Sequence, residues 1–127
     1  MPGFSIKNTT RGRVPRLSFE GMAKSILGSK YELSLVICGD TLAQRMNKEY
    51  RKNTYKPNVL SFPISKTEGE MFLNVQCAKR EAKKYGTAFQ KRLALLFVHG
   101  CYHLKGFDHS DKMEELELKT LKRFRLA

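Results

Sequence analysis

Histidine occurs at three positions in this chain, and their spacing could build a metal site. If His99 and His103 lie on one helix, the four-residue spacing places both imidazoles on the same face, one turn apart. Gly106 can then end this helix in a left-handed conformation that most residues resist, so that the chain returns and His109 faces the pair. Three imidazoles without a fourth protein ligand form a zinc site that stays open to water, which is the arrangement of catalytic zinc. The sequence therefore predicts one zinc ion per chain, although nickel, copper and iron also accept imidazole ligands.

The same histidine spacing occurs in the metzincin proteases, whose motif is His-Glu-x-x-His-x-x-Gly-x-x-His. In this chain Gly100 occupies the position of the catalytic glutamate. Cys101 lies between the two helical histidines, but at roughly 100° per residue it points about 200° away from His99 and is expected in the core. The pattern therefore indicates the ligands of a metal site without the base that a protease needs.

Two other residues could act beside the metal. Asp108 either orients an imidazole or a water at the metal, or satisfies backbone donors of its own turn, and the residues alone leave both roles open. Arg51 is expected at the end of a helix, before a basic loop. Its guanidinium could hold a phosphate bidentately, or its charge could complement the helix dipole. From the residues alone the dipole role is favoured.

The composition limits the class of protein and its partners. With 127 residues, 41% of them hydrophobic and 28% charged, the chain is expected to fold as one globular domain over residues 1–127. A net charge of +12 favours nucleic acid or another polyanion as the partner. Three cysteines without a CxxC pair are typical of a reducing cytosol, and no apolar run reaches the roughly 20 residues that cross a bilayer. We therefore expect a cytoplasmic protein that does not enter a membrane.

Hydrophobic patterning and turn residues predict the elements that would position these groups. Strands are predicted at 4–8, 32–38, 58–63 and 69–75. Helices are predicted at 15–27, 41–50, 76–85, 87–105 and 111–125. Pro15 would start the first helix, and capping boxes at Thr41 and Thr87 would start the second and the fourth. The order indicates an α+β fold: a small mixed sheet of about four strands packed against about five helices, with the metal site on a C-terminal helix and the following turn.

Several segments together resemble the YbeY family of bacterial rRNA maturation endoribonucleases. The resemblance is carried by residues 46–51, 58–63, 69–70, 78–82 and 99–109. These segments cover most of residues 32–125 in the family's order. The last is specific, because it combines the three-histidine spacing with Gly100, Leu104, Gly106 and Asp108. Pro57 departs from the family, in which a threonine usually precedes the Asn-Val-Leu-Ser-Phe-Pro segment.

The resemblance implies an α+β fold, zinc held by His99, His103 and His109, and hydrolysis of single-stranded RNA. It further implies roles in 3′-end maturation of small-subunit ribosomal RNA and in ribosome quality control. The expected partners are therefore single-stranded RNA, ribosomal RNA and the small ribosomal subunit. Arg51 matches the family's functionally important arginine, which reverses the preference for a dipole role. Ser61 lies in the family's Leu-Ser-Phe segment near the metal and joins Arg51 and Asp108 as a candidate catalytic residue, although a serine in a strand can also be purely structural.

The favoured chemistry is metal-assisted hydrolysis of a phosphodiester bond. Zinc would lower the pKa of a bound water towards ~7 and polarise a phosphoryl oxygen, while Arg51 would position the RNA backbone. The base could be a second water, Asp108 or the RNA's own 2′-hydroxyl, and the sequence does not distinguish them. The rival functions are a non-catalytic, ribosome-associated RNA-binding factor whose metal only holds the loop, and a metalloprotease, against which Gly100 argues.

Overall fold

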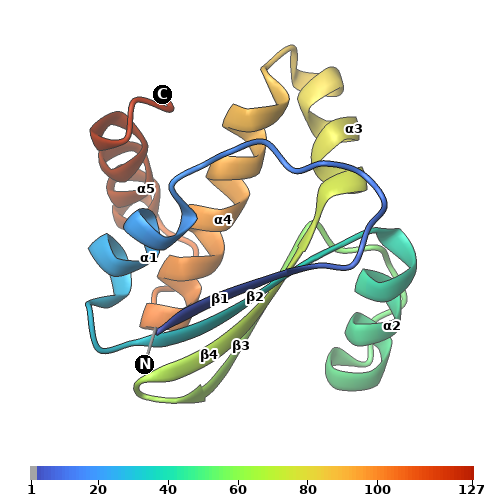
Figure 1. Ribbon diagram of the computed structural model, residues 1–127, viewed down its shortest axis with the longest axis horizontal. Coiled ribbons are helices and arrows are strands. Elements are labelled where there is room, and N and C mark those ends of the chain that lie inside the picture. The colour runs from blue at the N-terminus through green and yellow to red at the C-terminus, as the bar shows by residue number, and fades with distance from the viewer. Residues whose placement is uncertain (1–2) are drawn as a thin grey trace.

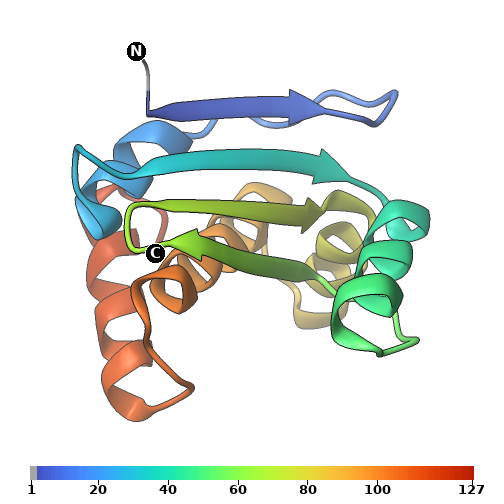
Figure 2. The ribbon, with the colours of Figure 1, turned by 90° about the horizontal axis from the view of Figure 1, so that it is seen from below.

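The computed structural model describes residues 3–127 and contains a four-stranded mixed sheet (Figures 1 and 2). Its strands are β1 (Phe4–Asn8), β2 (Glu32–Cys38), β3 (Val59–Ser65) and β4 (Glu68–Asn74), in the spatial order β1-β2-β4-β3. β1, β2 and β4 are parallel, and β3 pairs antiparallel with β4. β3 is therefore an edge strand, and its free side can line a cleft.

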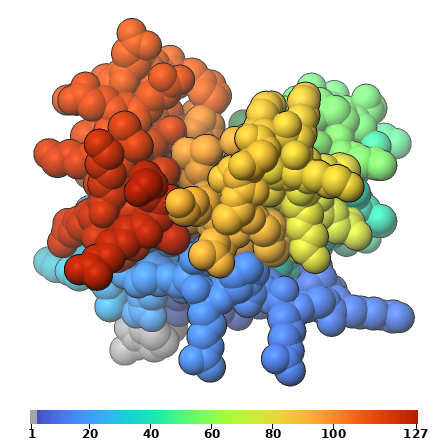
Figure 3. Space-filling model, turned by 90° about the horizontal axis from the view of Figure 1, so that it is seen from above, coloured from blue at the N-terminus to red at the C-terminus, as the bar shows by residue number. Residues whose placement is uncertain are grey.

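Five helices accompany the sheet in this part of the chain. They are α1 (Phe19–Leu27), α2 (Asp40–Arg51), α3 (Val75–Tyr85), α4 (Phe89–Lys105) and α5 (Asp111–Arg123). α1, α3, α4 and α5 cover one face of the sheet, and α2 packs on the other. Figure 3 looks onto the first face, where α5 in red, α4 in orange and α3 in yellow hide the sheet. The predicted α+β fold, with about four strands and about five helices, is confirmed.

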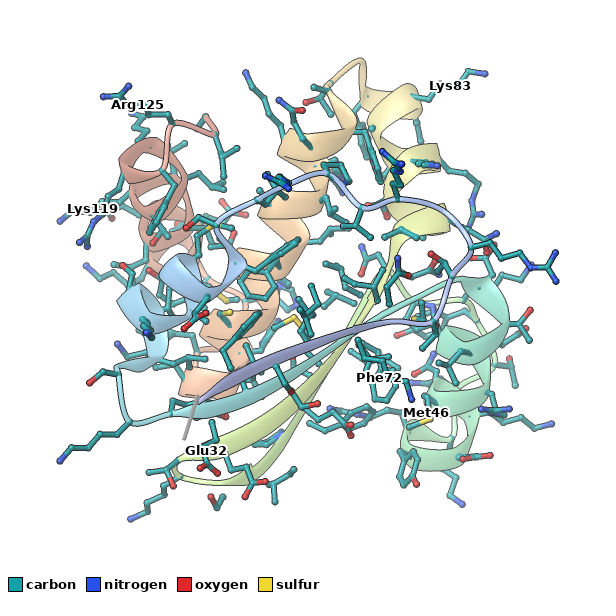
Figure 4. All side chains as sticks on the ribbon, in the orientation of Figure 1. Glu32, Met46, Phe72, Lys83, Lys119 and Arg125 are labelled. Carbon is teal, nitrogen blue, oxygen red and sulfur yellow. The ribbon has the colours of Figure 1, made fainter. Side chains whose placement is uncertain are left out.

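The larger apolar core lies between α4 and the sheet. Phe97 and Cys101 of α4 are fully buried there, together with Met71 of β4. Cys101 therefore faces the core, as its angular offset along the helix predicts. A smaller apolar cluster on the opposite face joins Phe72 of β4 to Met46 of α2, and Figure 4 shows these two side chains together beneath the sheet. The apolar face of α4 packs against the sheet, and the opposite face is free to carry functional side chains.

The beginning of α1 is the main departure from the predicted element ends. α1 begins at Phe19, whereas the sequence predicted a helix from Pro15. Residues 13–18 have no regular structure, and Val14 and Leu17 pack against the core from this irregular segment. Their burial satisfies the apolar pattern without a helical turn. The other predicted ends lie within two residues of those observed.

Neither predicted capping box forms. The N-cap residues of α2 and α4 are Gly39 and Ala88, and neither makes a side-chain capping hydrogen bond, so Thr41 and Thr87 do not cap these helices. The first backbone N–H of α2 donates instead to the side-chain oxygen of Gln76 in α3, at 2.8 Å. A tertiary contact has replaced the local one here, because an unpaired helix N–H accepts any well-placed oxygen.

Candidate metal centre

The three histidines meet at the carboxyl-terminal end of α4. His99 and His103 lie one turn apart on this helix, and their Nε2 atoms are 3.0 Å apart. Gly106 ends the helix with a φ of 105°, which turns the chain towards His109. The ring centroids are 4.5–4.8 Å apart, and one nitrogen of each ring lies within 4.8 Å of the others. The structure thus brings together all three residues that the sequence predicted as metal ligands.

Hydrogen bonds determine which nitrogen of each helical histidine can bind a metal. Nδ1 of His103 lies 3.0 Å from the backbone oxygen of Phe107, and because a carbonyl only accepts, this nitrogen carries the hydrogen. Nδ1 of His99 lies 2.6 Å from Oε2 of Glu117, whose carboxylate also accepts. The two Nε2 atoms therefore present lone pairs to each other. Two nitrogens bound to one tetrahedral zinc at about 2.0–2.1 Å stand ~3.3 Å apart, so the observed 3.0 Å fits a shared cation.

Burial favours the metal-binding form of His103. It lowers the pKa of this imidazole below its usual value, and the neighbouring His99 lowers it further. The backbone oxygen of Phe107 and the carboxylate of Glu117 act in the opposite direction without reversing the shift. Because a metal binds only a deprotonated imidazole nitrogen, the lowered pKa of His103 supports metal binding at neutral pH.

Glu117 is a site residue that the sequence analysis did not identify. It lies on α5, 18 residues beyond His99, and its side chain is 8% exposed. Met113 and Leu121, one turn before and one turn after it, are both buried. A carboxylate in the middle of an apolar helix face was therefore the available signal, since such a group is costly to bury without a partner.

Asp108 lies in the exposed turn between α4 and α5. Within residues 3–127 its carboxylate forms no hydrogen bond, either to an imidazole or to a backbone donor of the turn. It nevertheless lines the same cleft as the histidines. The carboxylate bonded to a histidine ring is that of Glu117.

Arg51 and Ser61 meet across the edge of the sheet. Arg51 ends α2, and its Nη2 donates to the backbone oxygen of Ser61 in β3 at 2.6 Å, while its guanidinium lies 5.0 Å from the ring centroid of Phe62. The hydroxyl of Ser61 donates to the backbone oxygen of Gly100 at 3.0 Å. Ser61 therefore connects β3 to the histidine-bearing helix, and Arg51 is held beside that connection.

Gly100 is buried where α4 approaches the sheet. A Cβ at this position would lie 2.8 Å from Cε of Met71 and 3.0 Å from Oγ of Ser61. Position 100 thus faces the sheet at close range, and a glutamate would have to displace both neighbours. Close packing against the sheet therefore disfavours, at position 100, the glutamate that serves as the base in metzincin proteases.

One open cleft of about 730 Å³ is bordered by the three histidines and by Arg51, Ser61, Asp108 and Glu117. β3 contributes Val59, Leu60 and Ser61, and the loop after α2 contributes Asn53 and Tyr55. α4, α5 and the turn between them supply the opposite wall. The cleft is large enough for more than a metal ion and a water, and it leaves the histidine nitrogens open to a ligand.

The sequence of this chain matches a known protein family. Residues 6–127 match the model of the family described as Endoribonuclease YbeY. The chain belongs to this family. An endoribonuclease YbeY from Mycoplasma mycoides is 40% identical over 95 residues, which cover 66% of this chain and 58% of that protein. The family member from Campylobacter jejuni strain 81-176 is 36% identical over 110 residues, which cover 80% of this chain and 81% of that protein.

A protein from Thermotoga maritima, known from a solution structure, shares the fold with a TM-score of 0.67. The two chains are 20% identical, and the match covers 95% of this chain and 92% of the other. At this identity the likeness concerns the fold alone. Across residues 3–127, no helix has both the length and the apolar character needed to cross a membrane.

Proposed function

We propose that this chain is a zinc-dependent endoribonuclease that hydrolyses single-stranded RNA. The observation that carries the proposal is the convergence of three imidazoles in an open cleft that also contains Arg51, in a member of the endoribonuclease YbeY family. His99, His103 and His109 would hold one zinc ion per chain. Bound zinc would supply a Lewis acid that activates water and polarises a phosphoryl oxygen.

The protein's own groups would position the RNA and stabilise developing charge. Arg51 uses only Nη2 in its bond to Ser61 within the described chain, which leaves its other N–H groups for phosphate oxygens. Its guanidinium is kept in place by that bond and by the Phe62 ring, so the side chain loses little conformational freedom when it binds phosphate. Such a fixed donor stabilises the charge that builds on phosphate in the transition state.

The proton of the attacking water has three candidate acceptors. Asp108 is an exposed carboxylate at the cleft, a second water could enter the open site, and RNA carries its own 2′-hydroxyl. Ser61 is not among them, because its hydroxyl is bonded to the backbone of α4. In this proposal Ser61 is a positioning residue, because its backbone oxygen holds Arg51 and its hydroxyl holds the helix that carries His99 and His103.

The biological setting proposed is that of the family. We propose that the chain acts as one domain, residues 1–127, in the cytoplasm, in 3′-end maturation of small-subunit ribosomal RNA and in ribosome quality control. Ribosomal RNA and the small ribosomal subunit would be its partners. The net charge of +12 supports a polyanionic partner.

The proposal is tested by RNA cleavage with defined metal content. Wild-type chain should cut a single-stranded oligonucleotide, lose that activity with a chelator and regain it with zinc, while His103→Ala should stay inactive. An unstructured peptide incubated in parallel should remain intact, because Gly100 occupies the position of the glutamate base that a metzincin protease needs. RNA binding without cleavage in zinc-loaded wild type would instead support a non-catalytic RNA-binding factor.

A further inference from the structure

Arg92 lies in line with the histidines on α4. It precedes His99 by seven residues, which is 20° short of two full turns, so both residues are on nearly the same side of the helix. The rise between them is about 10 Å at ~1.5 Å per residue. Arg92 also borders the cleft that contains the three histidines. A cation is thus placed on the cleft wall two turns away from the metal ligands.

The Arg92 guanidinium is fixed in one orientation. Its Nε and Nη2 both lie 2.9 Å from Oε1 of Glu81, and its central carbon lies 4.9 Å from the ring centroid of Tyr85. Glu81 is itself held, because Asn58 donates to its other oxygen at 3.1 Å. Nη1 makes neither a hydrogen bond nor an ion-pair contact in the described chain. Its two N–H donors are left for an acceptor in the cleft.

The segment that leads to Arg92 carries an excess of positive charge. Residues 79–92 contain six basic residues, of which Arg80 is paired with Asp40, and one acidic residue, Glu81. The basic side chains include Lys83 at the exposed end of α3, which extends into solvent in Figure 4. An ion pair that served only to join α3 to α4 would need neither this excess of positive charge nor a place at the cleft.

We propose that Arg92 binds a backbone phosphate of the RNA strand, one or two nucleotides away from the phosphate that is cleaved. This proposal rests on the proposed function in one respect only, which is the position of the scissile phosphate at the three histidines. Arg51 and Arg92 then contact different phosphates, and the distance along α4 sets the length of RNA that fills the cleft. Glu81 acts as a positioning residue that presents the guanidinium edge.

The experiment measures binding without metal, so that it does not depend on cleavage. The affinity of metal-free chain for a single-stranded oligonucleotide is measured against salt concentration for wild type, Arg92→Gln and Lys91→Gln. Lys91→Gln is the matched control, because this substitution removes the same charge from the neighbouring residue, and Lys91 does not border the cleft. Arg92→Gln should bind about tenfold more weakly and lower the salt slope by ~0.7, as expected for one lost contact to a single strand. Lys91→Gln should leave the slope unchanged.

The result against the proposal is a wild-type slope in Arg92→Gln, or an equal fall in Lys91→Gln. Because Arg92→Gln leaves Glu81 without its partner, the pair Glu81→Gln and Arg92→Gln is measured as well, since two amides can keep the bond without charge. This double variant should show the same fall in slope at an unchanged unfolding temperature. If metal-loaded wild type cuts no RNA while the difference in slope persists, the proposed function fails and the phosphate subsite stands.

Discussion

Glu117 should control metal affinity through its bond to His99. Replacing Glu117 by glutamine keeps the size of the side chain but removes the negative charge of the carboxylate, whose Oε2 lies 2.6 Å from Nδ1 of His99. His99 then becomes a weaker electron donor at Nε2 and is less firmly oriented. Loss of such a partner typically weakens metal affinity by about 10–100-fold, which corresponds to about 1.4–2.7 kcal/mol.

The same substitution should have little effect on the metal-free fold. Glu117 is 8% exposed, and a neutral amide is cheaper to bury than a carboxylate, which offsets the weaker bond to His99. The free energy of unfolding without metal should change by less than about 1 kcal/mol. A fall in zinc affinity with a preserved metal-free fold separates control of the metal from general damage.

The assay is competition for zinc against a chromophoric chelator, together with urea unfolding of metal-free chain. Asp108→Asn is the matched control, because it removes a carboxylate of the same cleft that is bonded to no imidazole. This variant should bind zinc within about threefold of wild type. Wild-type affinity in Glu117→Gln, or an equal loss in Asp108→Asn, would refute the assignment of Glu117.

Three further predictions concern other parts of the molecule. Arg51→Ala should keep the zinc content and unfolding temperature of wild type but slow single-turnover cleavage by roughly 100-fold, with partial recovery in Arg51→Lys; cleavage at the wild-type rate would leave Arg51 only a helix-end charge. The hydrogen bond from Arg80 lowers the pKa of Asp40 to about 2, so Asp40→Asn should lose about 1 kcal/mol above pH 4 after allowance for solvent screening. In pH-dependent urea unfolding this difference should vanish as the pH falls through about 2, where the wild-type carboxyl is protonated, and a difference constant with pH would contradict the assigned pair. Gly106→Ala places a side chain at a φ of 105° and should cost about 1–2 kcal/mol in unfolding and weaken zinc binding, and an unchanged zinc affinity would show that His109 is positioned in another way.

The sequence was sufficient where a residue's role depends on its near neighbours. The spacing of His99 and His103 fixes their common helix face, and Gly106 supplies the turn that brings in His109. β2 was predictable from a run of apolar and β-branched residues that the sheet buries, whereas β1, which is mostly exposed, was predictable from the alternation of its side chains. These features involve a few consecutive residues, so the geometry of one element determines them.

The residues that the sequence analysis missed depend on contacts between elements. Glu117 reaches His99 only because α5 packs beside α4, and no local pattern gives that distance. The true cap of α3 is Asn74, whose side-chain oxygen accepts from two backbone N–H groups, although the surrounding segment was predicted as strand. Thr41 and Thr87 matched a capping pattern that the tertiary structure does not use. In each case a contact formed in the folded structure, and not the local sequence pattern, determined the role of the residue.

The most direct test of the central claim is the dependence of RNA cleavage on zinc stoichiometry. Metal-free chain is titrated with zinc, and the single-turnover rate on a single-stranded oligonucleotide is measured at each addition. We expect the rate to rise in proportion to zinc and to level off at one equivalent per chain, with no rise in His109→Ala at the same additions. Full cleavage before any zinc is added, or an equal rise in His109→Ala, would contradict the assignment of a catalytic zinc to the three histidines.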